Sequence, residues 1–189
     1  QALRAWCDKH NAVLIFDEVQ AGFGRTGKPF GFMHYGITPD LIACGKGISG
    51  GMPLSAVAGT EKLMNLYGPG EMTSTHSANP ICSAAALANI RVILDEGLIE
   101  HAAALEPVLV DGCRRIAAAA GGKVGRWDVT GLVGALQFAR PGTTTPDSDL
   151  AWKMVLRAIQ SGVMVFAPVG VGGCATKINP PLIITGDAL

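Results

Sequence analysis

Segments of two kinds alternate along this 189-residue chain and predict an α/β fold. Short apolar runs at 13–16 and 40–44 are typical of strands that are buried on both faces of a sheet, and 56–59 is a candidate third strand. Longer stretches with apolar residues at helical spacing precede or follow these runs. Because 49% of the residues are hydrophobic, the chain has enough apolar surface for a packed core, which excludes intrinsic disorder.

Helical segments in the first half of the chain have recognisable beginnings and ends. Residues 1–10 predict the end of an amphipathic helix, and 60–67 predict a short helix. Asn79 and Pro80 mark the start of a longer helix, because Asn can cap a helix and Pro suits its first position. We expect this helix to end at Gly97.

The second half of the chain predicts a long helix followed by a mixture of strands and a further helix. The long helix covers 98–119, where Pro107 either kinks it or restarts it. The later elements are predicted strands at 132–138, 163–166 and 178–185 and a predicted helix at 149–160. We place a domain boundary within the segment 98–110, which divides the chain into 1–104 and 105–189.

Charge and composition exclude several functional classes. Lys+Arg and Asp+Glu each number 15, so the formal net charge is zero, whereas a protein that tracks nucleic-acid phosphates has a basic excess. The apolar runs are too short to span a bilayer, and no secretory signal is visible. The five cysteines are odd in number and widely spaced, without metal-ligand spacing, so we expect reduced thiols, no metal site and a cytoplasmic location.

Both ends of the chain are expected to be cut from a longer sequence. The chain begins at Gln1 rather than at a Met, and it stops at Leu189, where the pattern of a helix is about to begin.

A glycine-rich loop at 22–27 matches G-x-G-x-x-G, a pattern of dinucleotide-binding turns. Such a turn requires a helix to begin immediately, and Pro29 and Gly31 disfavour one. The same loop also falls short of a P-loop, because Pro29 stands where Ser or Thr would bind magnesium. We interpret it as a tight loop that uses the backbone freedom of glycine, and we retain a nucleotide-binding module as an alternative.

A carboxylate and a lysine follow two of the predicted strands. Asp17 closes the first strand, and Lys46 follows the second between Gly45 and Gly47. In an open α/β sheet, ligands bind at the carboxyl ends of strands. The pair is compatible with a structural salt bridge. However, lysine also forms Schiff bases with carbonyl groups, and an acid that pairs with a pyridine nitrogen complements such a lysine in pyridoxal-phosphate enzymes.

Three segments resemble the motifs of one family in the expected order. Residues 14–27, L-I-F-D-E-V-Q-A-G-F-G-R-T-G, resemble the D-E-V-Q-x-G-F-G-R-T-G signature of class III aminotransferases, which are fold-type-I pyridoxal-phosphate enzymes. Residues 39–54 are similar to the lysine segment of that family. Residues 75–80 are similar to its T-x-x-G-N-P segment, with Ala78 where Gly is commoner.

The resemblance implies the fold and the domains. Residues 1–104 would form the C-terminal part of the large domain, a mixed-sheet α/β/α layer structure that binds pyridoxal phosphate. Residues 105–189 would form an incomplete small C-terminal α+β domain. The N-terminal part of the family, which supplies the glycine-rich phosphate loop and the residue stacked on the ring, would be absent.

The resemblance also implies a role for each matching residue. Lys46 would form the Schiff base and shuttle the proton between the substrate Cα and the cofactor C4′. Asp17 would keep the pyridine nitrogen protonated, and Gln20 would hydrogen-bond the phenolic oxygen. Thr75 would bind the phosphate of the cofactor in the neighbouring subunit, which implies a homodimer.

One candidate position departs from the family pattern. Several members have an Arg just before the final Pro-Pro-Leu strand that binds the α-carboxylate of the substrate, and the comparable residue here is Lys177. Lysine offers a point charge rather than a bidentate fork, so glutamate recognition of the usual kind is not expected. A solvated lysine at a strand end is the alternative interpretation.

The expected activity is transfer of an amino group between an amine or amino acid and a keto acid. An amino-acid racemase, epimerase, aminomutase or decarboxylase of the same family is the alternative, because such enzymes share Asp17, Gln20 and Lys46. A nucleotide-binding module without catalytic activity is the third hypothesis.

Overall fold

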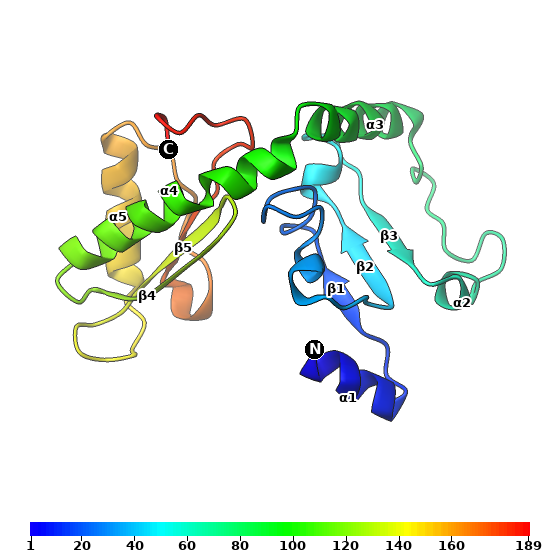
Figure 1. The fold of residues 1–189 in the computed structure, drawn as a ribbon, viewed down its shortest axis with the longest axis horizontal. Helices are drawn as coiled ribbons and strands as arrows, with labels where there is room; N and C mark the ends of the chain where they lie inside the picture. The colour runs from blue at the N-terminus through cyan, green and yellow to red at the C-terminus, as the bar shows by residue number, and fades with distance from the viewer. The chain divides into compact units, whose positions relative to one another are not determined.

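The computed structural model describes all residues from Gln1 to Leu189 and divides into two compact units, Gln1–Glu100 and His101–Leu189 (Figure 1). The division falls inside helix α4 (Leu98–Ala119), near the position 104/105 at which we placed the domain boundary. This helix runs through Pro107 without restarting. No helix is both long and apolar enough to cross a membrane.

A three-stranded mixed sheet forms the centre of the first unit. Its strands lie in the order β1 (Ile15–Asp17), β2 (Leu41–Cys44) and β3 (Ala56–Gly59) (Figure 1). β1 and β2 are parallel, whereas β2 and β3 are antiparallel. The helices of this unit are α1 (Ala2–His10), α2 (Glu61–Met64) and α3 (Pro80–Asp95).

The parallel pairing aligns the ends of β1 and β2. Asp17 pairs with Ala43, one residue before the end of β2, so both strands finish at the same edge of the sheet. Because the pairing is parallel, the segments that leave β1 and β2 emerge side by side. The first unit therefore brings two loops that are distant in sequence to one edge.

The other ends of these strands are tied together by Asp40. Its Oδ2 accepts the Leu14 N–H at 2.7 Å and a hydrogen bond from the Arg4 guanidinium of α1 at 2.7 Å. Arg4 also pairs with Asp8 at 2.6 Å. The Leu14 hydrogen bond and the Arg4 charge hold the pKa of the Asp40 carboxyl below its usual range.

We expect this carboxylate to make the stability of the first unit depend on pH at the acid end. Because the pKa is lower in the folded state, the stabilisation is present above the unfolded pKa of about 4 and is lost as the pH falls through the folded pKa. Asp40→Asn should lower the urea midpoint at pH 7 and flatten its decline below pH ~4. Asp8→Asn is the control, because the side chain of Asp8 is 64% exposed. An unchanged acid dependence in Asp40→Asn would contradict the assignment.

Helix α3 begins as its sequence predicts. The Asn79 side-chain oxygen accepts the N–H groups of Ile81 and Cys82 at 3.0 and 3.2 Å, and Pro80 occupies the first turn. These bonds satisfy amide groups that have no partner inside the helix. The predicted helix start at Asn79 and Pro80 is confirmed.

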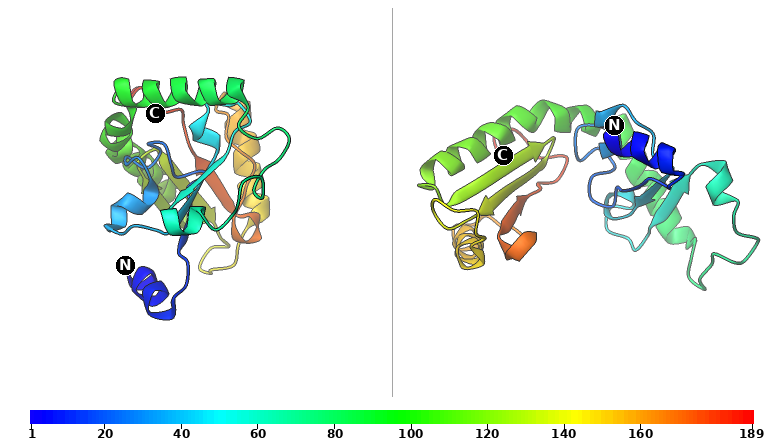
Figure 2. Two further views of the ribbon diagram at one scale, coloured as in Figure 1. Left: turned by 90° about the vertical axis from the view of Figure 1, so that its right-hand side faces the viewer. Right: turned by 90° about the horizontal axis from the view of Figure 1, so that it is seen from below.

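The second unit is an antiparallel sheet covered by helices on one face. Its strands lie in the order β4 (Val124–Thr130), β5 (Val133–Phe138) and β6 (Ala175–Ile178) (Figure 2). Its core joins side chains of α4, β5 and α5 (Ser148–Gln160), namely Leu109, Cys113, Leu136, Phe138 and Ala151. The face of the sheet that carries Leu136 is therefore the buried one.

Several predicted elements of the second unit are wrong. Residues 163–166 form no strand, and Met164 and Phe166 are 91% and 66% exposed. β6 ends at Ile178, so the expected strand over 178–185 does not form. Pro180 and Pro181 follow after Asn179, and proline has no N–H to donate to a strand ladder. β4 escaped prediction because polar residues alternate with its apolar ones, as is typical of a sheet with one open face.

The expectation of strands buried on both faces is also wrong for the residues present. Val13 and Ile15 are 48% and 58% exposed. The continuous apolar pattern correctly predicted strands, but no segment of these 189 residues covers that apolar surface. The short helix expected at 60–67 is limited to α2, Glu61–Met64.

Candidate functional site

Asp17 is the last residue of β1, and its carboxylate is exposed at the sheet edge. Its Oδ1 accepts the Val19 N–H at 3.0 Å, which fixes the side chain over the turn that follows the strand. No ion pair engages it. The carboxylate is therefore anchored through one oxygen and free to meet a cationic group.

Lys46 leaves the same edge of the sheet from the end of β2. It begins a 3-10 turn, Lys46–Ile48, in which the Ile48 N–H donates to the Gly45 carbonyl oxygen at 3.0 Å. Its φ is +40°, a left-handed conformation that costs a residue with a Cβ about 1–2 kcal/mol. Such a conformation persists only where neighbouring structure holds it, and this is common at functional sites. The side chain is exposed.

The glycines on either side of Lys46 allow the loop after β1 to pack directly on this turn. A Cβ at Gly45 would lie 3.4 Å from Val19 Cγ1, and one at Gly47 would lie 3.4 Å from Phe23 Cβ. Contacts of this length leave little room for a larger side chain. The segment after Asp17 and the turn at Lys46 are thus in mutual contact, and the two candidate residues share one surface.

Glu18 holds the loop in place, a function that our reading of the sequence missed. It is 1% exposed, and its carboxylate accepts the N–H groups of Gly31 and Phe32 at 2.9 and 2.8 Å. Its backbone continues the sheet, because its N–H donates to the Ala43 carbonyl oxygen at 2.9 Å. The signal for this role was an acid next to Asp17 at the start of a glycine-rich loop, where many backbone amides need acceptors.

We expect Glu18→Gln to destabilise the first unit. The amide keeps one acceptor oxygen but turns an NH₂ group toward a backbone N–H, and a buried donor without a partner costs about 1–3 kcal/mol. Urea unfolding followed by tryptophan fluorescence measures this loss. Glu96→Gln, at an exposed position after α3, is the matched control. Equal stability of the two variants would show that the Glu18 carboxylate is dispensable.

Gln20 and Thr75 occupy different environments. Gln20 is half-buried in the turn that follows Asp17, within the same loop. Thr75 is exposed in the segment between α2 and α3, and no hydrogen bond links it to either strand end. Ala78, where the family has Gly, adopts a left-handed φ of +51°. The first unit thus groups Asp17, Gln20 and Lys46, while Thr75 belongs to a separate exposed segment.

Lys177 lies on the open face of the second sheet. Its neighbour Thr176 pairs with Leu136 and is fully buried, whereas Lys177 pairs with Ala135 and points to the opposite face. The Lys177 Nζ lies 5.6 Å from the centre of the Phe166 ring, within the range of a cation–π contact. The ammonium group is therefore placed on the polar side of the sheet and not in the core.

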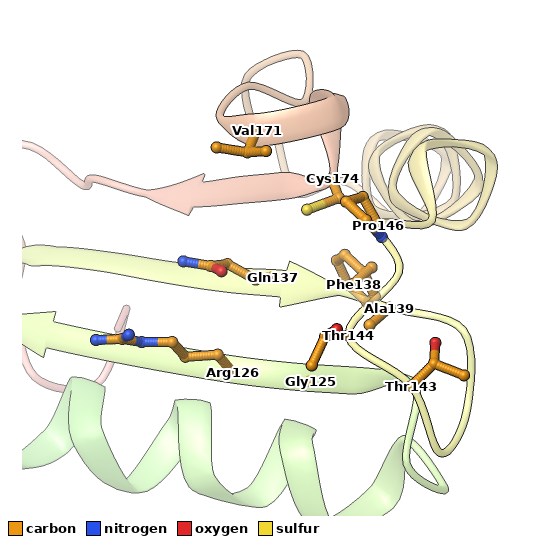
Figure 3. Close-up of a pocket in the computed structure, with 10 residues that line it drawn as sticks. All are labelled: Gly125, Arg126, Gln137, Phe138, Ala139, Thr143, Thr144, Pro146, Val171 and Cys174. Carbon is orange, nitrogen blue, oxygen red and sulfur yellow. The ribbon is translucent and has the colours of Figure 1, made fainter.

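A pocket of about 360 Å³ in the second unit contains none of the expected site residues (Figure 3). It lies between β4, β5 and the loop at 143–146, with Cys174 at one end. Its charged group, Arg126, is bound by Asp128 at 2.6 Å, and this guanidinium lowers the pKa of the Asp128 carboxyl. The amide of Gln137 and the hydroxyls of Thr143 and Thr144 are further polar groups that line the pocket.

The sequence matches one family over its whole length. The family model described as "Aminotransferase class-III" matches residues 1–189. The chain belongs to the class III aminotransferases. This family is dependent on pyridoxal phosphate and acts on an amino donor and a keto acid, in accord with the resemblance of the motifs.

Individual aminotransferases that resemble the chain agree with this assignment. A 4-aminobutyrate aminotransferase of Mycobacterium leprae is 38% identical to the chain, covering 97% of the chain and 41% of the relative. A 2-aminoadipate transaminase of Pseudomonas putida is 36% identical, covering 100% of the chain and 45% of the relative. A crystal structure of an aminotransferase from Bacillus anthracis matches 98% of the chain with a TM-score of 0.87 at 32% identity, covering 44% of that protein.

Two conclusions follow for the chain as a class III aminotransferase sequence. The predicted fold class, part of a fold-type-I transferase with mixed α/β architecture, is confirmed by these likenesses. The chain also spans less than half the length of the relatives that it matches. This share agrees with the expectation that it is a piece of a longer sequence.

Proposed function

We propose that this chain is part of a pyridoxal-phosphate-dependent aminotransferase that moves an amino group between an amine or amino acid and a keto acid. The observation that supports this most strongly is the shared sheet edge of Asp17 and Lys46. An acid and a lysine at the carboxyl ends of adjacent parallel strands occupy the place where α/β sheets bind ligands. The family assignment gives this pair its chemical meaning.

The residues at this edge fit the cofactor. Both side chains are exposed, and the glycines on either side of Lys46 place no side chain next to it. Neither forms an ion pair, so each is available to a bound group. Pyridoxal phosphate, when bound, supplies an electron sink for the bond that breaks at the substrate Cα.

Each candidate residue of the first unit has a distinct part in the proposal. The Lys46 Nζ binds the cofactor covalently and later carries the proton between the substrate Cα and the cofactor C4′. The Asp17 carboxylate holds the proton on the pyridine nitrogen, and the Gln20 amide hydrogen-bonds the phenolic oxygen. The Thr75 hydroxyl binds the phosphate of the neighbouring subunit's cofactor, so the active protein is a homodimer.

We further propose that Lys177 binds the carboxylate of the substrate. Its ammonium group lies on the polar face of the second sheet, where a carboxylate is able to approach it. A single ammonium group does not match the two oxygens of a carboxylate as the Arg of several family members does. We therefore propose a mode of carboxylate recognition that differs from the usual one for glutamate.

A half-reaction separates this proposal from the alternatives. The longer protein that contains this chain is loaded with pyridoxal phosphate and mixed with one amino donor in the absence of a keto acid. A transaminase releases one equivalent of keto acid and leaves the cofactor in its pyridoxamine form. Return of the inverted amino acid would indicate a racemase or epimerase, a rearranged amino acid an aminomutase, and release of CO₂ a decarboxylase. Saturable binding of NAD(H) or ATP without binding of pyridoxal phosphate would indicate a nucleotide-binding module.

A further inference from the structure

A side chain of α3 is bonded to the turn that presents Lys46. The Asn89 Nδ2 donates to the Gly47 carbonyl oxygen at 2.7 Å and lies 3.4 Å from the Ile48 carbonyl oxygen. Both carbonyl groups belong to the turn that starts at Lys46. Asn89 is half-buried, so the amide competes little with water for these bonds.

The same face of α3 packs on the end of β2. Ala86, three residues before Asn89, forms a buried cluster with Cys44 and Ile48, and Ile90 packs against it. This cluster fixes the distance between the helix and the turn. The packing of α3 therefore places Asn89 next to the turn and restricts the movement of its amide relative to the turn.

The amide also lies close to the next bend of the loop. A Cβ built at Gly50 would lie 3.0 Å from the Asn89 Oδ1, and Gly50 has a φ of +63°. The amide therefore fills the space between α3 and the backbone from Gly47 to Gly50.

The turn contains a conformation that needs such support. Lys46 has a left-handed backbone conformation. Within the turn, the Ile48 N–H donates to the Gly45 carbonyl oxygen, and the Ser49 N–H donates to the Lys46 carbonyl oxygen at a longer distance of 3.4 Å. A lysine in this conformation relaxes toward an ordinary φ when its neighbours are released. The bonds from Asn89 oppose that relaxation one residue further along the chain.

We infer that Asn89 is a positioning residue for Lys46: its amide fixes the Gly47 and Ile48 carbonyl groups and so directs the lysine side chain toward the surface shared with Asp17. The inference rests on the proposed role of Lys46. Asn89 itself touches neither cofactor nor substrate in this account. Asn89 acts only by setting the direction in which the Lys46 side chain extends. That direction decides how the Lys46 Nζ approaches the cofactor and the proton that the lysine transfers.

Two substitutions test the inference. Asn89→Ala removes the donor, and Asn89→Asp keeps the shape but turns a carboxylate oxygen toward two carbonyl oxygens. Asn65→Asp, the same chemical change at the exposed end of α2, is the matched control. All variants are made in the longer protein that contains this chain, with and without pyridoxal phosphate.

The first readout requires no cofactor. Hydrogen exchange of the peptide 45–52 in the cofactor-free protein should speed up at least threefold in Asn89→Ala and more in Asn89→Asp, while peptides of β1 and α2 exchange as before. In the loaded protein, the pH midpoint of the cofactor absorbance should move by at least ~0.3 units, and kcat should fall about 10-fold with KM changed less than twofold. One lost hydrogen bond that orients a reacting group gives an effect of this order.

A merely structural role predicts a different pattern. In that case Asn89→Ala lowers the melting temperature, but peptide 45–52, the pH midpoint and the low-temperature kcat match those of Asn65→Asp, and this result would overturn the inference. Failure of the proposed function is distinguishable, because Lys46→Ala would then leave the cofactor absorbance and the amino transfer unchanged.

Discussion

Lys46→Ala in the longer protein that contains this chain should abolish covalent attachment of pyridoxal phosphate and lower the rate of amino transfer by about 10⁴-fold or more. The substitution removes both the nucleophile and the group that carries the proton. The protein should still fold, because the Lys46 side chain is exposed and forms no ion pair. Visible absorbance of the bound cofactor and a single-turnover assay with an amino donor measure the two losses.

Lys28→Ala is the control for this experiment, because Lys28 is an exposed lysine of the glycine-rich loop outside the proposed site. It should retain the absorbance band and the rate. A Lys46→Ala protein that keeps the band would remove Lys46 from its proposed role and would direct attention to another amine.

Asp17→Asn should retain attachment of the cofactor at Lys46 but lower the rate of the half-reaction by roughly 10²-fold or more. An amide is uncharged and cannot hold the pyridine nitrogen in its protonated form, so the ring accepts electrons less readily. The fold should survive, because the amide oxygen can still accept the Val19 N–H that Asp17 Oδ1 accepts at 3.0 Å. Stopped-flow absorbance of the loaded protein with a saturating amino donor measures the rate.

Asp95→Asn is the matched control at the exposed end of α3 and should leave this rate unchanged. A rate for Asp17→Asn within threefold of the wild-type value would contradict the role of its charge. Loss of the cofactor band in this variant would point instead to a role in binding alone.

Local elements of the first unit could be predicted because the residues that determine them are close together in the sequence. A continuous apolar run predicted β2, and Asn79 with Pro80 predicted the start of α3. The expectation that Asp17 and Lys46 form one site rested on the rule that ligands bind at the carboxyl ends of strands in an α/β sheet. The parallel register of β1 and β2 agrees with this expectation. These features depend on residues that are neighbours in sequence or on a general rule of topology.

The residues that support the site depend on contacts between distant segments. The Glu18 carboxylate accepts hydrogen bonds from the backbone N–H groups of residues 31 and 32, and Asn89 reaches the turn at Lys46 from helix α3. Nothing in the immediate sequence of Asn89 distinguishes it from a surface polar residue, and the signal for Glu18 is only its place at the start of a glycine-rich loop. The predicted strand at 163–166 was wrong for a related reason: an apolar run becomes a strand only where a partner strand is present, and none pairs with this segment.

Peptide mapping identifies which lysine of the protein binds pyridoxal phosphate, a role that we propose for Lys46. The longer protein is loaded with pyridoxal phosphate, reduced with borohydride to make the attachment permanent, digested, and analysed by mass spectrometry. We expect one equivalent of the reduced pyridoxyl group on the peptide that contains Lys46. Attachment at any other lysine, or no stable attachment in a folded protein that is saturated with cofactor, would contradict it.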